Sequence, residues 1–132
     1  MAIDQRPLVE SLRAYLATLH GCAQVELLET HISFVLVAGS FAYKLKKAVK
    51  LPFLDFSTLD ARRYYCEQEL RLNRRYAPQL YLDVVPVTGS AGNPDVGGAG
   101  PAIEYAVWMR AFAQQDLASR VLQRGALSPQ HI

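Results

Sequence analysis

Residues 41–50 read FAYKLKKAVK and combine the pattern of a β-strand with four lysines. Because successive side chains of a strand point to opposite faces, this segment has one small and basic face and one apolar face. The small and basic face carries Ala42, Lys44 and Lys46. The apolar face carries Phe41, Tyr43 and Leu45. The whole chain has a formal net charge of only +2, so this local density of lysines calls for an explanation.

A solvated basic face is the common reason for such a pattern, since half-buried strands pack one side on a helix and leave the other side in water. Lys47 and Lys50 fall near the end of the strand and would extend that basic surface. On the strand alone, this interpretation is favoured.

A helix expected at residues 57–76 offers the lysines an acidic partner. With a turn of about 100° per residue, Glu69 lies in the middle of the apolar arc of this helix, whereas Glu67 lies outside it. A buried carboxylate needs a partner because an unpaired buried charge is costly. The inward lysines of the strand would supply one. A local contact of Glu69 with Arg62 or Asn73 is the alternative.

The surrounding sequence predicts an α+β fold with a five-stranded, mainly antiparallel sheet. Apolar periodicity and turn residues indicate a helix at 5–19 that ends at Gly21, and strands at about 24–29, 32–38, 41–48, 81–89 and 102–112. Ser57 and Asp60 predict a capping box at the start of the 57–76 helix, which packs across one face of the sheet. The Gly/Pro-rich segment 90–101 is expected to be a flexible loop, and 115–123 a short C-terminal helix.

Length and composition indicate a single domain spanning residues 1–132. Fourteen basic against twelve acidic residues give a nearly balanced charge, which argues against a nucleic-acid or membrane partner. The two cysteines lack metal-ligand spacing, the three histidines form no ligand set, and no signal pattern or long apolar run is present. We therefore expect a cytoplasmic protein with no metal site of its own.

The order of these elements resembles the small, N-terminal lobe of protein kinases and small-molecule kinases. In that lobe a lysine on the third strand contacts the α- and β-phosphates of ATP, and a glutamate on the following helix orients the lysine. The resemblance is made more specific by the sequence segments YKLKK, LDFSTL, LNRRYAP and LYLDVVPVT. Over roughly residues 25–132 the chain resembles a bacterial family of aminoglycoside phosphotransferase-like proteins, bifunctional aminoglycoside phosphotransferase/ATP-binding proteins.

The resemblance implies a nucleotide site with named residues. Lys44 would contact phosphate, Glu69 would pair with Lys44, and Ala42 would pack on the adenine, as in the kinase VAIK motif that FAYK resembles. Lys46 is the alternative for the phosphate role, because strand register is readable only to about one residue. Val107–Phe112, which includes Met109, would lead into the hinge that receives the adenine. The implied cofactors are ATP and Mg²⁺.

Two features depart from the kinase pattern. No glycine-rich motif joins the first two strands, so backbone N–H groups of Thr30 to Ser33 would have to take its place. The catalytic aspartate, the asparagine and the metal-binding aspartate belong to the large lobe of kinases, and no such motifs occur here. We therefore assign no catalytic residue and no metal ligand to this chain. We expect a fragment or truncated product, inactive without the large lobe as its partner.

Two further interpretations stay open. In the first, the chain is a standalone interaction module. Its basic patch for a protein or anion partner is then formed by Lys44, Lys46, Lys47 and Lys50. An apolar surface around Trp108, Met109 and Phe112, left uncovered without a large lobe, would also favour self-association.

Overall fold

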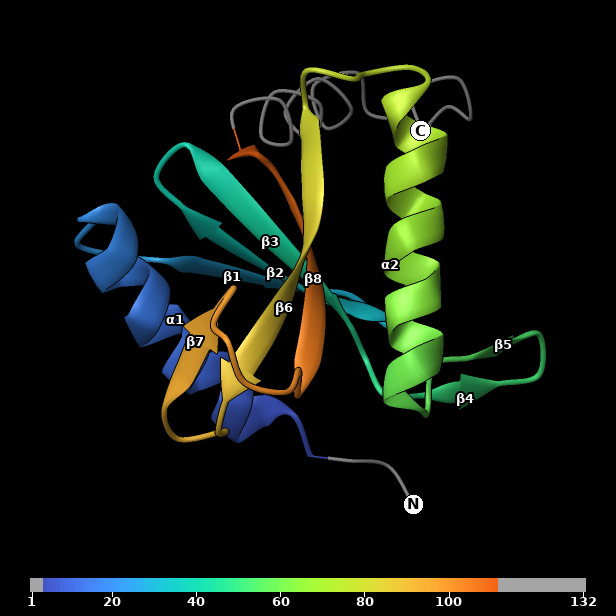
Figure 1. The fold of residues 1–132 in the computed structure, drawn as a ribbon, viewed down its shortest axis with the longest axis horizontal. Coiled ribbons are helices and arrows are strands. Elements are labelled where there is room, and N and C mark those ends of the chain that lie inside the picture. Colours follow the sequence, from blue (N-terminus) through green and yellow to red (C-terminus); the bar gives the residue numbers. More distant parts are fainter. Residues whose placement is uncertain (1–3, 112–132) are drawn as a thin grey trace.

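The computed structural model describes residues 4–111 and has an α+β architecture with two helices and a curled antiparallel sheet of six strands in that range (Figure 1). Along the chain the elements are α1 (Arg6–His20), β1 (Glu26–Glu29), β2 (Ser33–Ala38), β3 (Phe41–Lys46), β4 (Lys50–Leu51), β5 (Leu54–Asp55), α2 (Leu59–Arg74), β6 (Tyr81–Gly89), β7 (Pro94–Val96) and β8 (Glu104–Arg110). The strand order in the sheet is β1-β2-β3-β8-β6-β7, and β4 pairs with β5 in a separate hairpin. The α+β prediction is confirmed.

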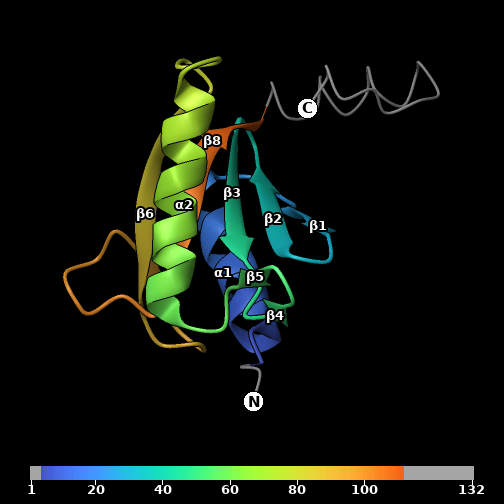
Figure 2. The same ribbon diagram turned by 90° about the vertical axis from the view of Figure 1, so that its right-hand side faces the viewer.

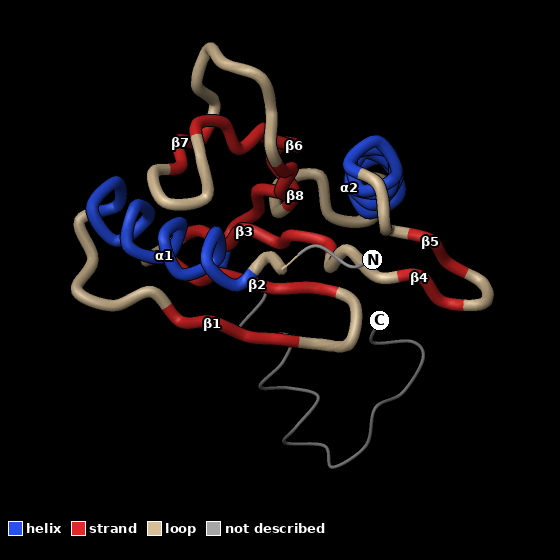
Figure 3. Tube along the Cα trace, turned by 90° about the horizontal axis from the view of Figure 1, so that it is seen from below, coloured by secondary structure: helices blue, strands red, loops and turns tan. Residues whose placement is uncertain are grey.

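The two helices cover opposite faces of the sheet, as Figure 2 and the view from below in Figure 3 show. Alternation along β2 and β3 sends Leu36, Tyr43 and Leu45 toward α1, whereas Val35, Val37 and Ala42 lie on the side of α2. The strand faces were therefore correctly predicted, and the lysines of β3 lie on the α2 side.

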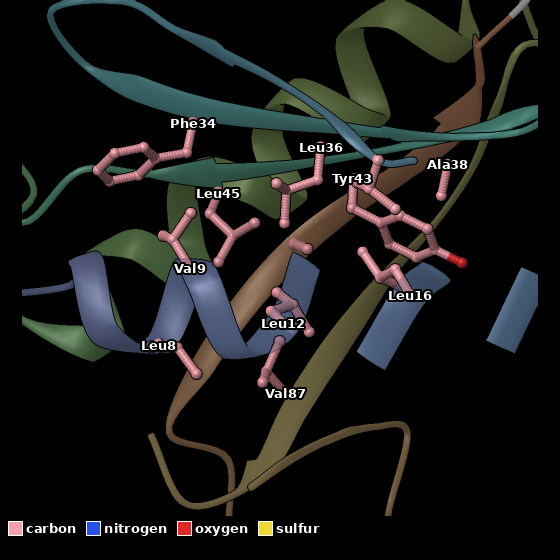
Figure 4. Close-up of a cluster of buried hydrophobic side chains, with 12 residues drawn as sticks. Leu8, Val9, Leu12, Leu16, Phe34, Leu36, Ala38, Tyr43, Leu45 and Val87 are labelled. Carbon is pink, nitrogen blue, oxygen red and sulfur yellow. The ribbon is translucent and has the colours of Figure 1, made fainter. Parts of the chain in front are cut away.

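α1 covers its face through an apolar stripe at helical spacing, formed by Leu8, Val9, Leu12 and Leu16 (Figure 4). The helix ends at Gly21, whose φ of 64° is the left-handed conformation that favours glycine. Leu19, which continues the same helical spacing, is 54% exposed and lies outside the core.

α2 begins two residues later and ends two residues earlier than the predicted helix at 57–76. Its N-cap is Thr58, whose hydroxyl accepts a hydrogen bond from the Ala61 N–H at 3.1 Å. The prediction of a Ser57 cap is wrong, because the Ser57 hydroxyl instead donates to Asp55 in the preceding turn. Serine and threonine are both good caps, so neighbouring candidates are hard to separate from sequence.

The five-stranded sheet is also a wrong prediction, since β7 adds a sixth strand inside the segment expected to be a flexible loop. β7 pairs with β6 from Val87↔Val96 to Gly89↔Pro94. A tight turn makes this pairing possible: Gly89 has a φ of 84°, and an added Cβ there would meet the Asn93 carbonyl oxygen at 2.5 Å. The Tyr15 hydroxyl then donates to Asp95 at 2.7 Å and attaches β7 to α1.

The predicted C-terminal helix at 115–123 lies outside the described residues. Neither helix of the described part of the chain has the length and apolar character needed to cross a membrane.

Candidate functional site

The basic face of β3 lies in the sheet next to apolar neighbours. Ala42 pairs with Val37 on one side and with Met109 on the other, and Lys44 pairs with Val35 and Val107. On the α2 side of the sheet, this register brings together an apolar floor formed by Val35, Val37, Ala42, Val107 and Met109. Lys44 and Lys46 follow Ala42 on the same face of β3. The short side chain of Ala42 is fully buried in that floor.

Glu69 of α2 meets both lysines. Lys44 Nζ lies 3.2 Å from Glu69 Oε2, and Lys46 Nζ donates to Glu69 Oε1. The Lys44 side chain is 29% exposed, compared with 7% for Lys46 and 15% for Glu69. We call these three residues the Lys44–Lys46–Glu69 cluster. The sequence predicted an inward pairing of Glu69 with β3, and the structure has that pairing with two partners in place of one.

The cluster keeps Glu69 ionised. Burial would raise the pKa of the Glu69 carboxyl, but the charges of Lys44 and Lys46 and their hydrogen bonds outweigh burial and hold that pKa below its usual value. Two ammonium groups then face one carboxylate, which leaves one net positive charge at a partly open position. The arrangement is therefore suited to an anion that approaches Lys44.

The alternative contacts within α2, from the Glu69 carboxylate to Arg62 or Asn73, do not occur in the structure. Arg62 pairs with Glu104 instead, and Asn73 donates to the Glu69 main-chain carbonyl at 2.9 Å and not to its carboxylate. Glu67 lies outside the buried arc, as predicted, and its carboxylate is 3.4 Å from Arg63.

Met109, predicted near the adenine hinge, is only 3% exposed and packs with Val35, Val37, Ala42 and Val107. The expectation that Met109 forms part of an uncovered apolar surface is therefore wrong. Trp108 points to the other face and packs against the α1 core, where its buried Nε1 has no hydrogen-bond partner among residues 4–111. Phe112 lies outside the described residues.

The β1–β2 turn is less available to phosphate than expected. Thr30 Oγ1 accepts from the N–H groups of Ile32 and Ser33, at 3.3 and 3.0 Å, and the Thr30 N–H donates to the Ser33 carbonyl at 2.9 Å. Those three N–H groups stabilise the turn itself and are not free to bind phosphate.

The outer lysines do not form a free basic patch. Lys47 Nζ lies 2.6 Å from Glu29 Oε2, and Arg6 contacts the same carboxylate at 2.9 Å. Hydrogen bonds from Lys47 and Arg6 hold the pKa of Glu29 below its usual value. Lys50, on β4, is exposed.

A buried polar network beside the cluster was missed at the sequence level. Glu104 and Arg62 are 1% and 2% exposed, and Arg62 Nε donates to Glu104 Oε1 at 2.9 Å. Gln5 Nε2 donates to Glu104 Oε2 at 2.9 Å. One signal was available, because Glu104 is the sole acidic residue in the otherwise largely apolar segment AIEYAVWM. Its partner lies 42 residues away, which no local pattern reveals.

Two more titratable groups border the α2 side. Burial raises the pKa of the Cys66 thiol to about 12, so this cysteine is a packed, unreactive side chain. Burial and the nearby Glu69 charge raise the pKa of Tyr81. Within residues 4–111, no group of three or more histidine, cysteine, aspartate or glutamate side chains is arranged to hold a metal ion.

Comparison with known proteins gives relatives without an assigned activity. An uncharacterized protein of Mycobacterium tuberculosis and one of Mycobacterium bovis are each 37% identical to this chain over 97 residues, which cover 74% of this chain. The chain spans 18% of the length of these relatives. No protein-family model matches the chain. No solved structure matches it.

Proposed function

We propose that this chain is the ATP-binding small lobe of an aminoglycoside phosphotransferase-like small-molecule kinase. In this proposal the sheet and α2 form a kinase-like small lobe. Lys44 contacts the α- and β-phosphates of the nucleotide, and Glu69 orients Lys44. Ala42 and Met109, which are buried, lie in the apolar layer beneath the adenine, and Lys46 lies beside the phosphate site.

The main support for the proposal is the ion pair between Lys44 of β3 and Glu69 of α2, whose charged atoms are 3.2 Å apart where the helix packs on the strand. A lysine held in this way is preorganised, because its ammonium group is fixed before any ligand arrives. Lys44 is also the more exposed of the two lysines, so it retains a side open to an incoming anion. On a surface that only attracts polyanions, a carboxylate between the central lysines would weaken binding, because it cancels part of their positive charge.

The chemistry of the cluster fits a phosphate group better than a neutral ligand. The single net positive charge lies next to the apolar floor of Val35, Ala42 and Val107. The phosphates of a nucleotide would match this charge, whereas the side chains of the floor are at most 6% exposed and would meet the base only at their edge. Burial of the ammonium group against these side chains strengthens its attraction for phosphate, because the effective dielectric constant is lower there.

Phosphoryl transfer requires additional groups. Mg²⁺, when bound, would neutralise the phosphate charge that develops during transfer. We assign neither a metal ligand nor a catalytic base to the described residues. In the proposal these come from a large lobe, and the chain alone binds nucleotide without transferring phosphate.

An interaction module with a basic patch is the alternative. The pairing of Lys47 with Glu29 and of Lys44 and Lys46 with Glu69 weakens this candidate, because these contacts neutralise much of the proposed patch. An anionic partner would then meet only the exposed Lys50 and the open side of Lys44, not four free lysines.

The test is a titration of the chain with ATP and Mg²⁺, followed by NMR chemical shifts, on the unmodified chain and on Lys44→Ala. We expect saturable shifts at Ala42, Lys44, Glu69 and the β8 residues Val107–Arg110, and at least about tenfold weaker binding for Lys44→Ala, the loss typical of one charge-assisted contact. Lys50→Ala is the matched control, since it removes an exposed lysine that lies outside the cluster.

The alternative predicts a different result. Shifts spread over all four lysines, equal losses for Lys44→Ala and Lys50→Ala, and abolition by moderate salt would favour a basic patch over a nucleotide site. An unmodified chain that shows no saturable shift at millimolar ATP would overturn the proposed function.

A further inference from the structure

The strongest feature outside the cluster lies where β3 and β8 separate. Their pairing runs from Phe41↔Arg110 to Leu45↔Ala106, and the described register ends there. Lys46 is the next residue of β3: it still pairs with Ser33 of β2, but on the β8 side its main chain has reached the end of the ladder, at the position where its ammonium group meets Glu69. Buried main-chain groups at such a position need another partner.

Gln5, at the start of α1, supplies that partner with its side-chain amide. Its Nε2 donates to the Lys46 carbonyl at 3.0 Å, and its Oε1 accepts from the Ala48 N–H at 2.8 Å. Gln5 is 8% exposed, and these contacts join residues more than 40 positions apart in sequence. One buried amide therefore holds the chain on both sides of Lys47.

Glu104 and Arg62 hold Gln5 in turn. Gln5 Nε2 also donates to Glu104 Oε2 at 2.9 Å, while the other oxygen of Glu104 accepts from Arg62 Nε at 2.9 Å. Arg62 Nη1 donates to the Phe56 carbonyl at 2.9 Å. The network is thus continuous from α2 through β8 to the residue before α1, and it ends on the main chain of Lys46.

α2 meets this arrangement at two points. Arg62 and Glu69 are seven residues apart, about two helical turns, and therefore lie on nearly the same side of the helix. Arg62 connects α2 to Glu104 of β8, and Glu69 connects α2 to Lys44 and Lys46 of β3. The same helix side is joined to the network at one end and to the cluster at the other.

We propose that Gln5 is a positioning residue for the candidate site: anchored by Glu104 and Arg62, it sets the place of the Lys46 main chain and thereby the contact of the Lys46 ammonium with Glu69. With Glu69 held by Lys46, Lys44 keeps its open side for an anion. The part that concerns ligand binding rests on the proposed function, whereas the part that concerns Glu69 does not. No contact of Gln5 with a ligand is involved.

The test is Gln5→Met, which keeps the length and neutrality of the side chain but removes all three of its hydrogen bonds. Glu69 is followed by ¹³C NMR of its carboxyl group during a pH titration without nucleotide. We expect the pKa of Glu69 to rise toward its ordinary value, because the Lys46 ammonium is no longer fixed beside it. Where ATP binds, we expect its affinity to fall as well, because the ammonium groups of the cluster are no longer held in place before the ligand arrives.

Tyr15→Phe is the matched control. It removes a side-chain hydrogen bond of the same helix α1, from Tyr15 to Asp95 at 2.7 Å, that does not reach Lys46. We expect it to leave the Glu69 titration unchanged. If Gln5→Met lowered the stability of the fold but left the Glu69 titration unchanged, as we expect for Tyr15→Phe, the role of Gln5 would be purely structural. That result would overturn the proposal.

A second measurement covers the case in which Gln5→Met does not fold. In the unmodified chain, the side-chain amide signals of Gln5 should shift with the same midpoint as the Glu69 carboxyl, and Glu69→Gln should remove that midpoint. The amide of Asn93, in the β6–β7 turn, is the reference that should not respond. Gln5 signals that ignore the Glu69 titration would refute the positioning role. Failure of the unmodified chain to bind ATP would instead refute the proposed function alone.

Discussion

The two faces of the sheet are built in different ways. Under α1 the buried cluster is apolar and consists largely of leucine, valine and aromatic side chains. Under α2 the apolar cluster is smaller, and it is bordered by the buried or half-buried charges of Lys44, Lys46 and Glu69. Apolar packing stabilises a fold whatever its function, whereas charges under a helix persist only where each has a partner. The difference therefore marks the α2 face as the specialised one.

The largest effect should come from the ion pair of α2 with β8. Arg62→Met leaves Glu104 buried without its charged partner, and we expect the free energy of unfolding to fall by about 4 kcal/mol. Chemical denaturation measures this loss. If the α2 face were ordinary packing, the same change would cost much less, since methionine fills a similar volume.

The double variant Arg62→Met/Glu104→Leu is the matched control. It removes both charges, so we expect it to recover much of the stability lost in Arg62→Met, as replaced buried ion pairs often do. A double variant as unstable as the single one would show that shape, and not the unpaired charge, causes the loss.

On the α1 face the corresponding change is Leu12→Ala. Leu12 is 1% exposed in the apolar cluster, and we expect its truncation to cost about 3 kcal/mol through lost burial and the cavity left behind. The Glu69 carboxyl titration should stay the same in this variant, because the cavity lies on the other side of the sheet. Leu19→Ala, on the exposed side of α1, should change stability by less than about 0.5 kcal/mol. A shifted Glu69 titration in Leu12→Ala would mean that the two faces are not independent.

The two faces also differ in how far the sequence predicts them. Strand alternation put Tyr43 and Leu45 opposite Ala42, Lys44 and Lys46, and the helical period put Glu69 inside and Glu67 outside; both signals are local. Which lysine meets Glu69 depends on the rotation and depth of α2 on the sheet. The structure has both contacts, because residues two apart on a strand lie on one face within reach of the same carboxylate.

Two features escaped prediction from the sequence, for different reasons. Gln5 and Glu104 are separated by 99 residues, and a glutamine before a helix reads as an ordinary polar residue. β7 escaped prediction because glycine and proline usually mark loops, whereas here Gly89 forms the tight turn that pairs Pro94–Val96 with β6. The Gln5–Glu104 contact is long-range and no single segment encodes it, whereas the β6–β7 hairpin is local and its turn residues are also those typical of a loop.

The stability of the α2 face should depend on pH, unlike that of the apolar α1 face, and we expect this effect to be smaller. Glu69 has a lowered pKa in the folded chain, so its contribution to stability is fully present above the ordinary value of 4.5 and is lost as pH falls through the lower folded pKa. Lys44→Met removes one charged partner of Glu69 and should cost about 1.5 kcal/mol at neutral pH. We expect this difference to shrink as the pH drops below 4.5. Denaturation of both proteins across this pH range measures the difference. A Lys44→Met effect that is constant with pH would mean that the lysine acts through packing and not through its charge.

The smallest expected effect tests where the helix of the specialised face begins. Thr58→Ala removes the hydroxyl that accepts the Ala61 N–H, and we expect a loss of about 1 kcal/mol, the typical value for an N-cap. Ser57→Ala is the neighbouring control; it removes only a hydroxyl in the exposed turn with Asp55 and should cost less than about 0.5 kcal/mol. A larger loss in Ser57→Ala would place the cap one residue earlier. The contacts of Glu69 with Lys44 and Lys46, more than two turns into the helix, would be unaffected by that difference.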